Sequence, residues 1–282
     1  MKKIRLYELM TDNYMHNQYM YGAYKHYENY EREFFALNGV MLKEYAGTIV
    51  GDENEIKIRF FKSQFFLMAM LFFDIFRNKY KVVITGSRTH WILLLSIISW
   101  KNSLDIHLHG QFYGSFESKY KKWLWNFIGN RVSLKLACPY YRSDVNLEIL
   151  EGIHLLPDTA RRKVTDYNRK NKKVIGILSG IGRAKWKGFE RLTDLENLGY
   201  QIRYYEPAIE SVNEWNNYLE FMREIDYLYL NPVNDYFLFS PSGVITDSKN
   251  YKKPMIAFES NKFIDNLIKR GCTGFKLISS KS

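Results

Sequence analysis

Cysteine is scarce in this chain, because only Cys138 and Cys272 occur in 282 residues. Two cysteines cannot build a disulfide framework or a cysteine-based zinc site, and their scarcity fits a reducing compartment. Long apolar runs are lacking too, since 65–73 and 91–98 fall far short of the roughly 20 residues that span a bilayer. The opening MKKIRLYELMTDNY lacks the apolar core of a signal peptide. We therefore expect a globular protein of the cytoplasm.

Several signatures of known active sites are also absent. The sequence contains no G-x-S-x-G nucleophile elbow. Its glycines at 180, 182 and 188 miss the G-x-G-x-x-G spacing of a dinucleotide fingerprint, and no P-loop ending G-K-[ST] follows them. No stretch resembles the paired aromatic strands that read RNA. We therefore expect no nucleic-acid partner.

Positive charge is in excess, with a formal net charge of +11, and the excess is larger over residues 161–282 than over residues 1–160. A basic surface favours anionic partners such as a phosphorylated substrate or anionic lipid headgroups. Tyrosines cluster in residues 14–30, a polar-aromatic segment with no clean period. This segment is interpreted either as a loop that covers a pocket or touches a membrane, or as an ordinary surface loop followed by the start of a helix.

Short apolar runs alternate with amphipathic stretches over residues 1–160. The alternation predicts an α/β domain, in which a mostly parallel sheet carries helices on both faces. The expected strands are 3–9, 80–86, 104–110 and 132–138, and the expected helices are 27–38, 57–77, 91–100, 117–129 and a short one from Ser143.

A polar, basic stretch at residues 158–173 has almost no large apolar residues and is interpreted as an interdomain linker. A second alternating series follows it, so the sequence predicts two domains, 1–160 and 161–282. The expected strands of the second domain are 173–180, 200–207, 225–230 and 253–258, and its expected helices are 187–199, one ending near Arg223 and one after Ser240.

A glycine-rich, basic loop follows the first expected strand of the second domain, in the sequence SGIGRAKWKGFERL. Small residues let a ligand approach the backbone, and Arg183, Lys185 and Lys187 come just after Gly182. Arginine can hold phosphate oxygens with two donors, and lysine adds a point charge. The loop is therefore interpreted as a diphosphate site, with an ordinary basic surface loop as the alternative.

The stretch FSPSGVITDSKNYKKPMIAF, residues 239–258, predicts a helix that begins near Ser242 and Gly243. Serine is a good N-cap, and the free N–H groups at a helix start bind anions. Asp247 lies about one turn inside, where a carboxylate could accept two ribose hydroxyls or could simply favour the helix start. Both loops follow strands, at the edge where open α/β sheets bind ligands. They are therefore expected to bracket a diphosphate, unless the stretch is only a turn and a cap.

Matching residues in both halves resemble the GT-B glycosyltransferases, especially the large retaining family four. That family has a Gly-Arg followed by a Lys-Gly that opens a helix, as do Gly182-Arg183 and Lys187-Gly188 here. It then has a carboxylate on a helix and a strand seven residues later, which Asp247 and residues 254–257 match. In the first half, LDIHLHG resembles the family's strand that ends in His-Gly.

The resemblance implies an α/β fold with two Rossmann-like domains facing each other across a crevice. It further implies an enzyme that moves a sugar from a nucleotide-sugar donor to a carbohydrate or lipid-linked acceptor, as in polysaccharide biosynthesis. Such an enzyme needs no metal and no cofactor besides its donor substrate. Together with the positive charge and the tyrosines, a lipid-linked acceptor leads us to expect peripheral attachment to the inner face of the cell membrane.

The resemblance also assigns roles to the matching residues. Arg183 and Lys187 would neutralise the diphosphate of the donor, and the matching Gly182 would belong to the same binding site. The backbone N–H groups near Ser242 and Gly243 would hold the distal phosphate. Asp247 would replace the glutamate that binds the ribose. His109 would lie at the sugar and is the expected catalytic residue.

Two departures from the family keep other functions open. The family has a second acidic residue eight positions before the ribose carboxylate, where this chain has Phe239. The glycine-rich loop after the first strand is missing as well, because ELMTDNYMHNQYM stands there. A nucleotide-sugar epimerase with the same diphosphate site and a non-catalytic binding partner with the same fold therefore remain alternatives.

One strand allows a different chemistry. Asp105, His107 and His109 share a face if 104–110 is a strand, so they could bind a metal ion. No fourth ligand is evident from the sequence, and a structural role for His107 is the favoured interpretation.

Overall fold

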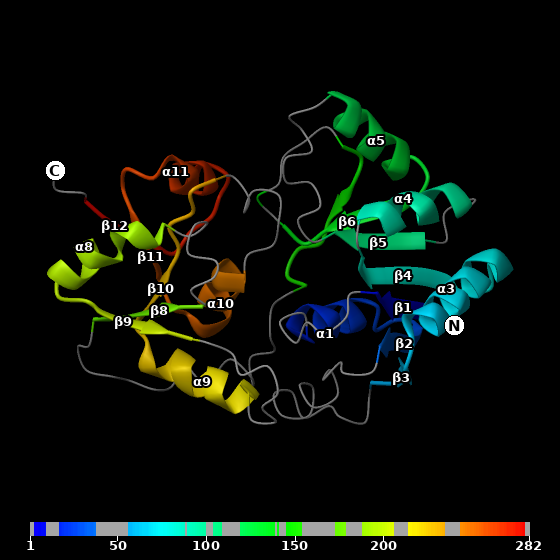
Figure 1. The fold of residues 1–282 in the computed structure, drawn as a ribbon, viewed down its shortest axis with the longest axis horizontal. Helices are drawn as coiled ribbons and strands as arrows, with labels where there is room; N and C mark the ends of the chain where they lie inside the picture. The colour runs from blue at the N-terminus through cyan, green and yellow to red at the C-terminus, as the bar shows by residue number, and fades with distance from the viewer. Residues whose placement is uncertain are drawn as a thin grey trace. The chain divides into compact units, whose positions relative to one another are not determined.

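In the computed structural model of the chain, the described residues are 3–9, 17–37, 56–87, 89–99, 104–108, 119–138, 140, 145–153, 173–178, 188–205, 214–234 and 243–279. They form two compact units, the first within residues 1–154 and the second within residues 155–282 (Figure 1). The predicted boundary at residue 160 falls in the stretch 154–172, outside the described residues.

The first unit is built on a seven-stranded sheet in the order β3-β2-β1-β4-β5-β6-β7, and its paired strands are parallel. Strands that are covered on both faces show no alternation of buried and exposed residues, as the almost wholly buried β4 and β5 illustrate. The strands are β1 (Lys3–Glu8), β2 (Glu31–Leu37), β3 (Ile58–Phe61), β4 (Lys81–Gly86), β5 (Leu104–Leu108), β6 (Ser133–Leu136) and β7 (Glu148–Ile149).

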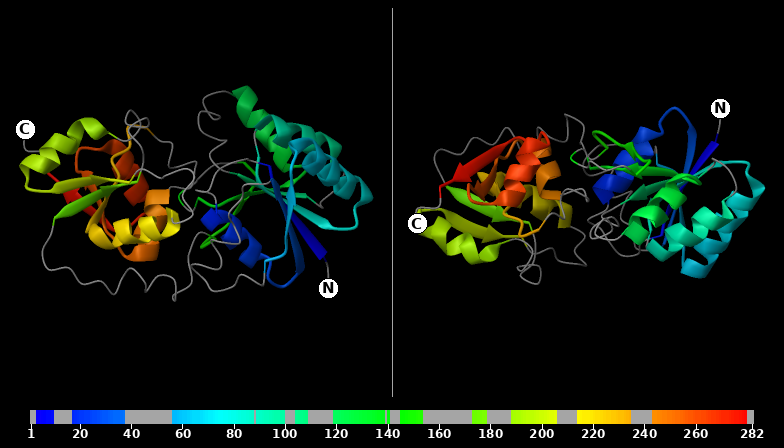
Figure 2. Two further views of the ribbon diagram at one scale, coloured as in Figure 1. Left: turned by 60° about the horizontal axis from the view of Figure 1, so that its bottom comes forward. Right: turned by 90° about the horizontal axis from the view of Figure 1, so that it is seen from above.

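Helices cover both faces of this sheet, as predicted (Figures 1 and 2). The helices α3 (Gln64–Arg77), α4 (Thr89–Ile98) and α5 (Lys119–Gly129) lie on one face, and α1 (Asn17–His26) lies on the other. Right-handed crossovers place these helices on opposite faces. The connection through α1 runs from β1 to β2, whereas the connections through α3, α4 and α5 run in the opposite direction along the sheet. Within the described residues, no helix is both long and apolar enough to cross a membrane.

The predicted helix at residues 27–38 is wrong, because β2 occupies most of that stretch. Phe34, Phe35 and Ala36 are fully buried in β2, which lies between β1 and β3. A strand buried on both faces shows no alternation, and the charged residues 31–33, with which β2 begins, resemble the first turn of a helix. The tertiary position of the strand decides its structure here, and its local sequence does not.

The tyrosine-rich segment 14–30 is not a pocket-covering loop over its described residues. It contains the helix α1, and the side chains of Tyr19, Tyr21, Tyr24 and Tyr27 are all buried. The hydroxyls of Tyr19 and Tyr27 contact polar groups of β5. The tyrosines of this helix therefore belong to the core of the first unit.

Two further expected helices are corrected by the structure. The stretch 57–77 divides into β3 and α3, because Ser63 ends the extended chain and its side chain accepts a hydrogen bond from the N–H of Phe65 as an N-cap. After residue 143, the described residues 145–153 contain the short strand β7 and no helix. Pairing with β6 accounts for this strand, since Lys135 and Glu148 lie opposite each other and form an ion pair of 2.5 Å.

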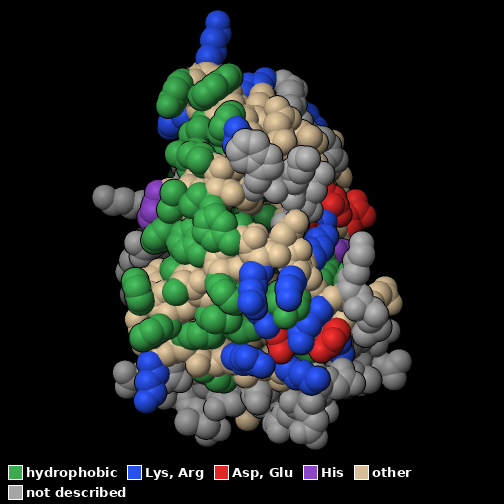
Figure 3. Space-filling view, turned by 90° about the vertical axis from the view of Figure 1, so that its right-hand side faces the viewer, with side chains coloured by type: hydrophobic (Ala, Val, Ile, Leu, Met, Phe, Trp, Pro, Cys, Tyr) green, Lys and Arg blue, Asp and Glu red, His purple; other side chains and the backbone are tan. Residues whose placement is uncertain are grey.

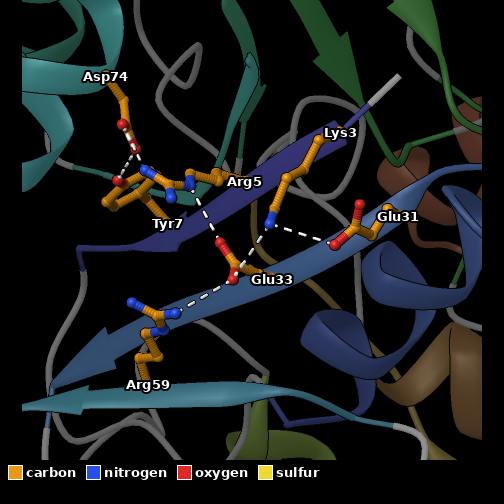
Figure 4. A network of polar contacts seen from close by, with 7 residues as sticks. All are labelled: Lys3, Arg5, Tyr7, Glu31, Glu33, Arg59 and Asp74. Carbon is orange, nitrogen blue, oxygen red and sulfur yellow. Dashed lines mark hydrogen bonds and ion pairs between the residues drawn. The ribbon is translucent and has the colours of Figure 1, made fainter. Parts of the chain in front are cut away.

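Charged side chains between β1, β2 and α3 neutralise one another inside the first unit (Figure 4). Glu33 pairs with Lys3 at 3.5 Å and with Arg5 at 3.1 Å. Arg5 also pairs with Asp74 of α3 at 2.5 Å, and the hydroxyl of Tyr7 donates to the same carboxylate. Asp74 is fully buried, so the one carboxylate of α3 is directed at the sheet and not at solvent.

The second unit has a five-stranded sheet in the order β12-β11-β10-β8-β9, again with parallel pairs. The chain after residue 258 adds α11 and β12, which the sequence did not lead us to expect. The elements are β8 (Val174–Ile177), η4 (Phe189–Arg191), α8 (Leu192–Asn197), β9 (Gln201–Tyr204), α9 (Glu214–Glu224), β10 (Tyr227–Tyr229), α10 (Gly243–Tyr251), β11 (Met255–Phe258), α11 (Lys262–Lys269) and β12 (Phe275–Ile278).

The two faces of the second sheet pack against different helices. Ile175, Ile177 and Ile256 form one core cluster with Leu192 and Leu195 of α8. On the other face, Phe221 of α9 and Ile225, which directly follows α9, lie against Gly176, and a Cβ there would come within 2.5 Å of the Ile225 side chain. Successive residues of β8 point to opposite faces of the sheet, so Ile175 and Ile177 pack against α8 while Gly176 faces α9.

Both strand orders are those of doubly wound α/β folds. The first sheet follows the order 3-2-1-4-5-6 and adds one more strand, and the second follows the order 2-1-3-4-5. Each order reverses direction once, between β1 and β4 in the first unit and between β8 and β10 in the second. The predicted α/β class with two Rossmann-like domains is confirmed, and the reversal points are where such folds bind ligands.

Candidate functional site

The candidate site lies at the carboxyl edge of the second sheet, where β8 and β10 adjoin at the reversal of strand order. The chain leaves β8 at Leu178 and is described again from Gly188, which precedes η4 and α8. It leaves β10 at Leu230 and begins α10 at Gly243. Both predicted ligand loops therefore start from neighbouring strand ends.

Gly188 fixes the end of the basic loop onto the end of β10. Its φ is 63°, in the left-handed region that favours glycine. The hydroxyl of Tyr229, the last residue of β10, donates to the Gly188 carbonyl oxygen. A Cβ at this position would lie 2.5 Å from the carbonyl oxygen of Asn231. The glycine is therefore required both by its backbone angle and by the close approach of the next strand's loop.

We expect Gly188→Ala to lower the free energy of unfolding by about 1–3 kcal/mol, the cost of a strained backbone, with further loss from the contact to Asn231. Gly199→Ala is the matched control, because Gly199 also has a positive φ of 81° but nothing lies within 4 Å of its Cβ position. Urea unfolding of both variants separates the two causes. Equal losses in both variants would show that the contact with Asn231 contributes nothing.

A pair of asparagines joins the ends of β10 and β11. The side-chain amide of Asn261 donates to Oδ1 of Asn231 at 2.6 Å and to the Pro232 carbonyl at 2.9 Å. The Oδ1 atom of Asn261 accepts from the N–H groups of Phe263 and Ile264, so the same residue caps α11. The sequence analysis missed this pair, although an asparagine directly after an apolar strand and before an amphipathic helix is a recognisable N-cap.

Gly243 is the first residue of α10, as predicted, and it is exposed with open space around its Cβ position. The first N–H groups of a helix have no partners within the helix and carry a partial positive charge. Because α10 follows β10, these N–H groups lie on the carboxyl side of the second sheet. The start of α10 therefore offers donors to an anion at that edge.

Asp247 lies one turn inside α10 and is almost completely buried, with 7% of its surface exposed. The hydroxyl of Tyr218 on α9 donates to its Oδ2 atom at 2.6 Å. Burial raises the pKa of this carboxyl to about 7, and the hydrogen bond from Tyr218 opposes that rise only in part. Asp247 is thus a buried acid that changes charge near neutral pH, in contrast to the ordinary carboxylate expected at a helix start.

Aromatic rings pack around Tyr218, the hydrogen-bond donor to this carboxyl group. The ring of Tyr218 packs edge-on against Tyr205, which follows β9, with centroids 5.1 Å apart. It also meets Tyr251, at the end of α10, with centroids 6.3 Å apart. Burial raises the pKa of the Tyr218 phenol well above its ordinary value, so the phenol keeps its proton and donates a hydrogen bond to Asp247. Nothing in the local sequence pattern indicated that Tyr218 would reach Asp247, because the two residues come from different helices.

The other predicted site residues, His109, Gly182, Arg183, Lys187 and Ser242, lie outside the described residues. In the described chain, β5 ends at Leu108, just before His109 in the sequence. Residue 178 follows β8, and α10 begins at residue 243. Their roles therefore stay predictions.

His107 has the structural role that the sequence analysis favoured. It is fully buried on β5, and its Nδ1 and Nε2 atoms lie 2.6 Å and 3.2 Å from the hydroxyls of Tyr19 and Tyr27. Tyr27 also donates to Asp105, which forms an ion pair of 2.8 Å with Lys81. No group of three metal-binding side chains occurs in the part of the chain that the structure describes, and His109 is outside it.

A buried carboxylate occupies the corresponding point of the first sheet. Glu8 ends β1 with 1% of its surface exposed and accepts a hydrogen bond of 2.9 Å from the hydroxyl of Thr85 on β4. A Cβ at Gly86 would lie 2.3 Å from the Oε1 atom of Glu8. The sequence analysis did not identify this group, because a glutamate at the end of an apolar strand carries no distinctive spacing.

Comparison with known proteins shows a likeness in structure alone. No protein-family model matches the chain, and no curated protein matches its sequence. The crystal structure of Anabaena Alr3699/HepE in complex with UDP and glucose matches with a TM-score of 0.58 and 13% identity, over 100% of this chain and 87% of that one.

The same protein in complex with UDP-glucose matches with a TM-score of 0.56 and 12% identity, over 100% and 86% of the two chains. A UDP-GlcNAc 2-epimerase from Neisseria meningitidis, bound to UDP-GlcNAc, reaches 0.48 at 12% identity over 100% and 88%, too low a score to support a conclusion. The likeness to HepE extends over both units, so this chain has the two-domain fold of the GT-B type.

Proposed function

We propose that this chain is a glycosyltransferase that binds a nucleotide-sugar donor at the carboxyl edge of its second sheet. The observation that supports this most is the reversal of strand order between β8 and β10, with Gly188 and the start of α10 at the same edge. Folds with this strand order bind nucleotides there. The structural likeness to a protein solved with UDP and glucose agrees with the proposal.

In this proposal the donor's diphosphate lies between the basic loop and the start of α10. Arg183 and Lys187 neutralise its charge, and the small Gly182 lets it approach the backbone. The N–H groups near Ser242 and Gly243 bind the phosphate oxygens. Sugar transfer leaves the nucleotide with additional negative charge, so donors that already point at these oxygens stabilise the leaving group.

The remaining roles follow the resemblance to the retaining family four. Asp247 accepts hydrogen bonds from the ribose, and His109 acts at the sugar. Phe239 cannot supply the second carboxylate of that family, so we propose the family's binding mode for the nucleotide and leave the stereochemistry of transfer to experiment. The proposed acceptor is a carbohydrate or a lipid-linked glycan.

We propose that donor binding requires neither a divalent metal nor a further cofactor, because two cations and a helix start can neutralise a diphosphate together. UDP, GDP, CMP and their sugars are to be screened by thermal shift, and the best of them measured by calorimetry with and without EDTA. Affinity is expected to be unchanged by EDTA. A loss of binding on chelation that added Mg²⁺ restores would refute the metal-independent site.

Product analysis separates this proposal from its alternatives. A glycosyltransferase is expected to release free nucleotide slowly from its donor when water replaces the acceptor, with the sugar unchanged. Release of an altered sugar would identify an epimerase instead. Tight donor binding without any turnover, with and without a panel of glycan acceptors, would identify a non-catalytic binding protein.

A further inference from the structure

The outer surface of α3, α4 and α5 exposes large apolar side chains. On α3, the phenylalanines Phe65, Phe66, Phe73 and Phe76 have 74%, 62%, 48% and 72% of their surface exposed. The opposite side of the same helix, with Leu67 and Leu71, is fully buried against the sheet. An ordinary surface helix is polar on its outer side, so a helix that is apolar all round normally has apolar material on both sides.

The neighbouring helices continue the apolar surface. Leu94 and Ile97 of α4 are 38% and 51% exposed, and Trp123 of α5 is 59% exposed. The Trp123 ring stacks between Tyr120 and Phe127, with centroids 6.0 and 5.8 Å away, so the aromatic groups form one row along α5. Figure 3 shows hydrophobic side chains gathered along this face of the first unit, with lysines, arginines and a few acidic side chains beside them.

The exposed charges of α3, α4 and α5 have one sign. Lys62, Arg77, Lys79, Lys119, Lys121 and Arg131 are exposed on or next to the three helices. The only carboxylate in α3, α4 and α5 is Asp74, which is fully buried and paired with Arg5. The guanidinium groups of Arg77 and Arg131 lie over the rings of Phe73 and Phe127, at 4.4 and 4.8 Å from their centroids. The face therefore combines apolar rings with cations and presents no carboxylate to solvent from these helices.

An anionic lipid surface fits this combination better than a protein surface. Helices that lie in a membrane interface carry lysine and arginine around a face rich in tryptophan, phenylalanine and leucine. Tryptophan and tyrosine favour the depth of the headgroups, and long basic side chains extend from apolar surroundings to the phosphates. Anionic headgroups attract each nearby lysine or arginine. A protein partner would instead need an apolar face surrounded by acidic groups.

We propose that the outer face of α3, α4 and α5 binds the surface of an anionic phospholipid membrane. The apolar rings enter the headgroup region, and the surrounding cations bind the lipid phosphates. This contact uses the first unit alone, so it stands or falls independently of nucleotide binding in the second unit.

Co-sedimentation with vesicles tests this proposal. The wild-type protein is expected to bind vesicles that contain phosphatidylglycerol at least tenfold more tightly than vesicles of phosphatidylcholine, and less tightly as salt is raised. The double variant Phe66→Ser/Phe76→Ser is expected to lose at least tenfold in affinity for the anionic vesicles. The matched control Leu198→Ser/Ile268→Ser removes exposed apolar side chains of the second unit and is expected to bind as the wild type does.

A second measurement keeps the test independent of how well the double variant folds. Brominated lipids quench tryptophan fluorescence only at short range, so they are expected to quench the wild-type protein and to quench Trp123→Phe much less. Absence of binding to anionic vesicles would overturn the proposal, as would equal loss in the control. A wild-type dimer that Phe66→Ser/Phe76→Ser converts to a monomer, without vesicle binding, would assign this face to a second copy of the chain instead.

Discussion

Asp247→Asn is expected to make the protein more stable at pH 8 and to weaken nucleotide binding at the same time. The folded state raises the pKa of this carboxyl from 3.8 to about 7 because burial penalises its charge. Between these two pH values the unfolded chain is ionised while the folded chain keeps the proton. Stability contributed by this group is therefore present at low pH and is lost as pH rises through about 7.

The size of the stability effect follows from the same pKa. At roughly 1.4 kcal/mol per pH unit, holding the charged carboxylate in place costs up to about 4 kcal/mol above pH 7. Asparagine has nearly the same shape, can accept the hydrogen bond from Tyr218 and carries no charge. We expect Asp247→Asn to gain about 1–4 kcal/mol at pH 8 and little at pH 4, as measured by urea unfolding at both pH values.

The nucleotide affinity of the same variant shows whether the buried carboxylate of Asp247 binds the ligand. If Asp247 accepts ribose hydroxyls, the amide accepts them less strongly, and nucleotide affinity is expected to fall about tenfold, or roughly 1.4 kcal/mol. Asp265→Asn, an exposed carboxylate in the first turn of α11, is the control and is expected to leave affinity unchanged. Unchanged affinity in Asp247→Asn with lowered stability would confine Asp247 to a role in the helix and remove it from the site.

The alanine variants of the basic loop are expected to lose the most affinity. A hydrogen bond to a charged group contributes about 1.5–3 kcal/mol, so Arg183→Ala and Lys187→Ala should each weaken nucleotide binding tenfold or more. Lys185→Ala comes from the same loop, removes the same charge as Lys187→Ala and is expected to have little effect. Calorimetric titration with the best nucleotide measures all three variants.

The same three variants can also contradict the proposed role of the loop in phosphate binding. Small and equal losses at positions 183, 185 and 187 would mean that the loop is only a solvated basic surface. A salt dependence that is identical for the wild type and Arg183→Ala would support the same conclusion, because a direct phosphate contact is weakened by salt.

Much of the fold could be predicted from the sequence because parallel strands leave a clear pattern. Short β-branched runs such as 80–86 and 173–180 end at glycine or a small residue, and both contain strands. The strand β2 could not be found in this way, because it begins with the charged residues 31–33, which resemble the first turn of a helix. The burial of the tyrosines of α1 could not be predicted either, because their hydroxyl groups make the segment look polar and their buried environment is formed only in the folded domain.

The candidate site was predictable only where one segment carries its own signal. A small residue at a helix start identified Gly243, and helical spacing identified Asp247. The contact of Asp247 with Tyr218 and the link between Asn231 and Asn261 each join separate elements. Such contacts depend on how helices and strand ends meet in the fold, and no local spacing encodes them.

Hydrogen exchange in the presence of nucleotide tests the central claim most directly, because it reports where binding occurs. Full-length protein is to be compared with and without saturating UDP, GDP or CMP. The account predicts slower exchange in peptides that cover residues 178–191 and 240–250, with no change in α3, α4 and α5. Protection confined to residues 3–9 and 81–87, at the reversal point of the first sheet, would contradict it, as would no protection with any of the three nucleotides.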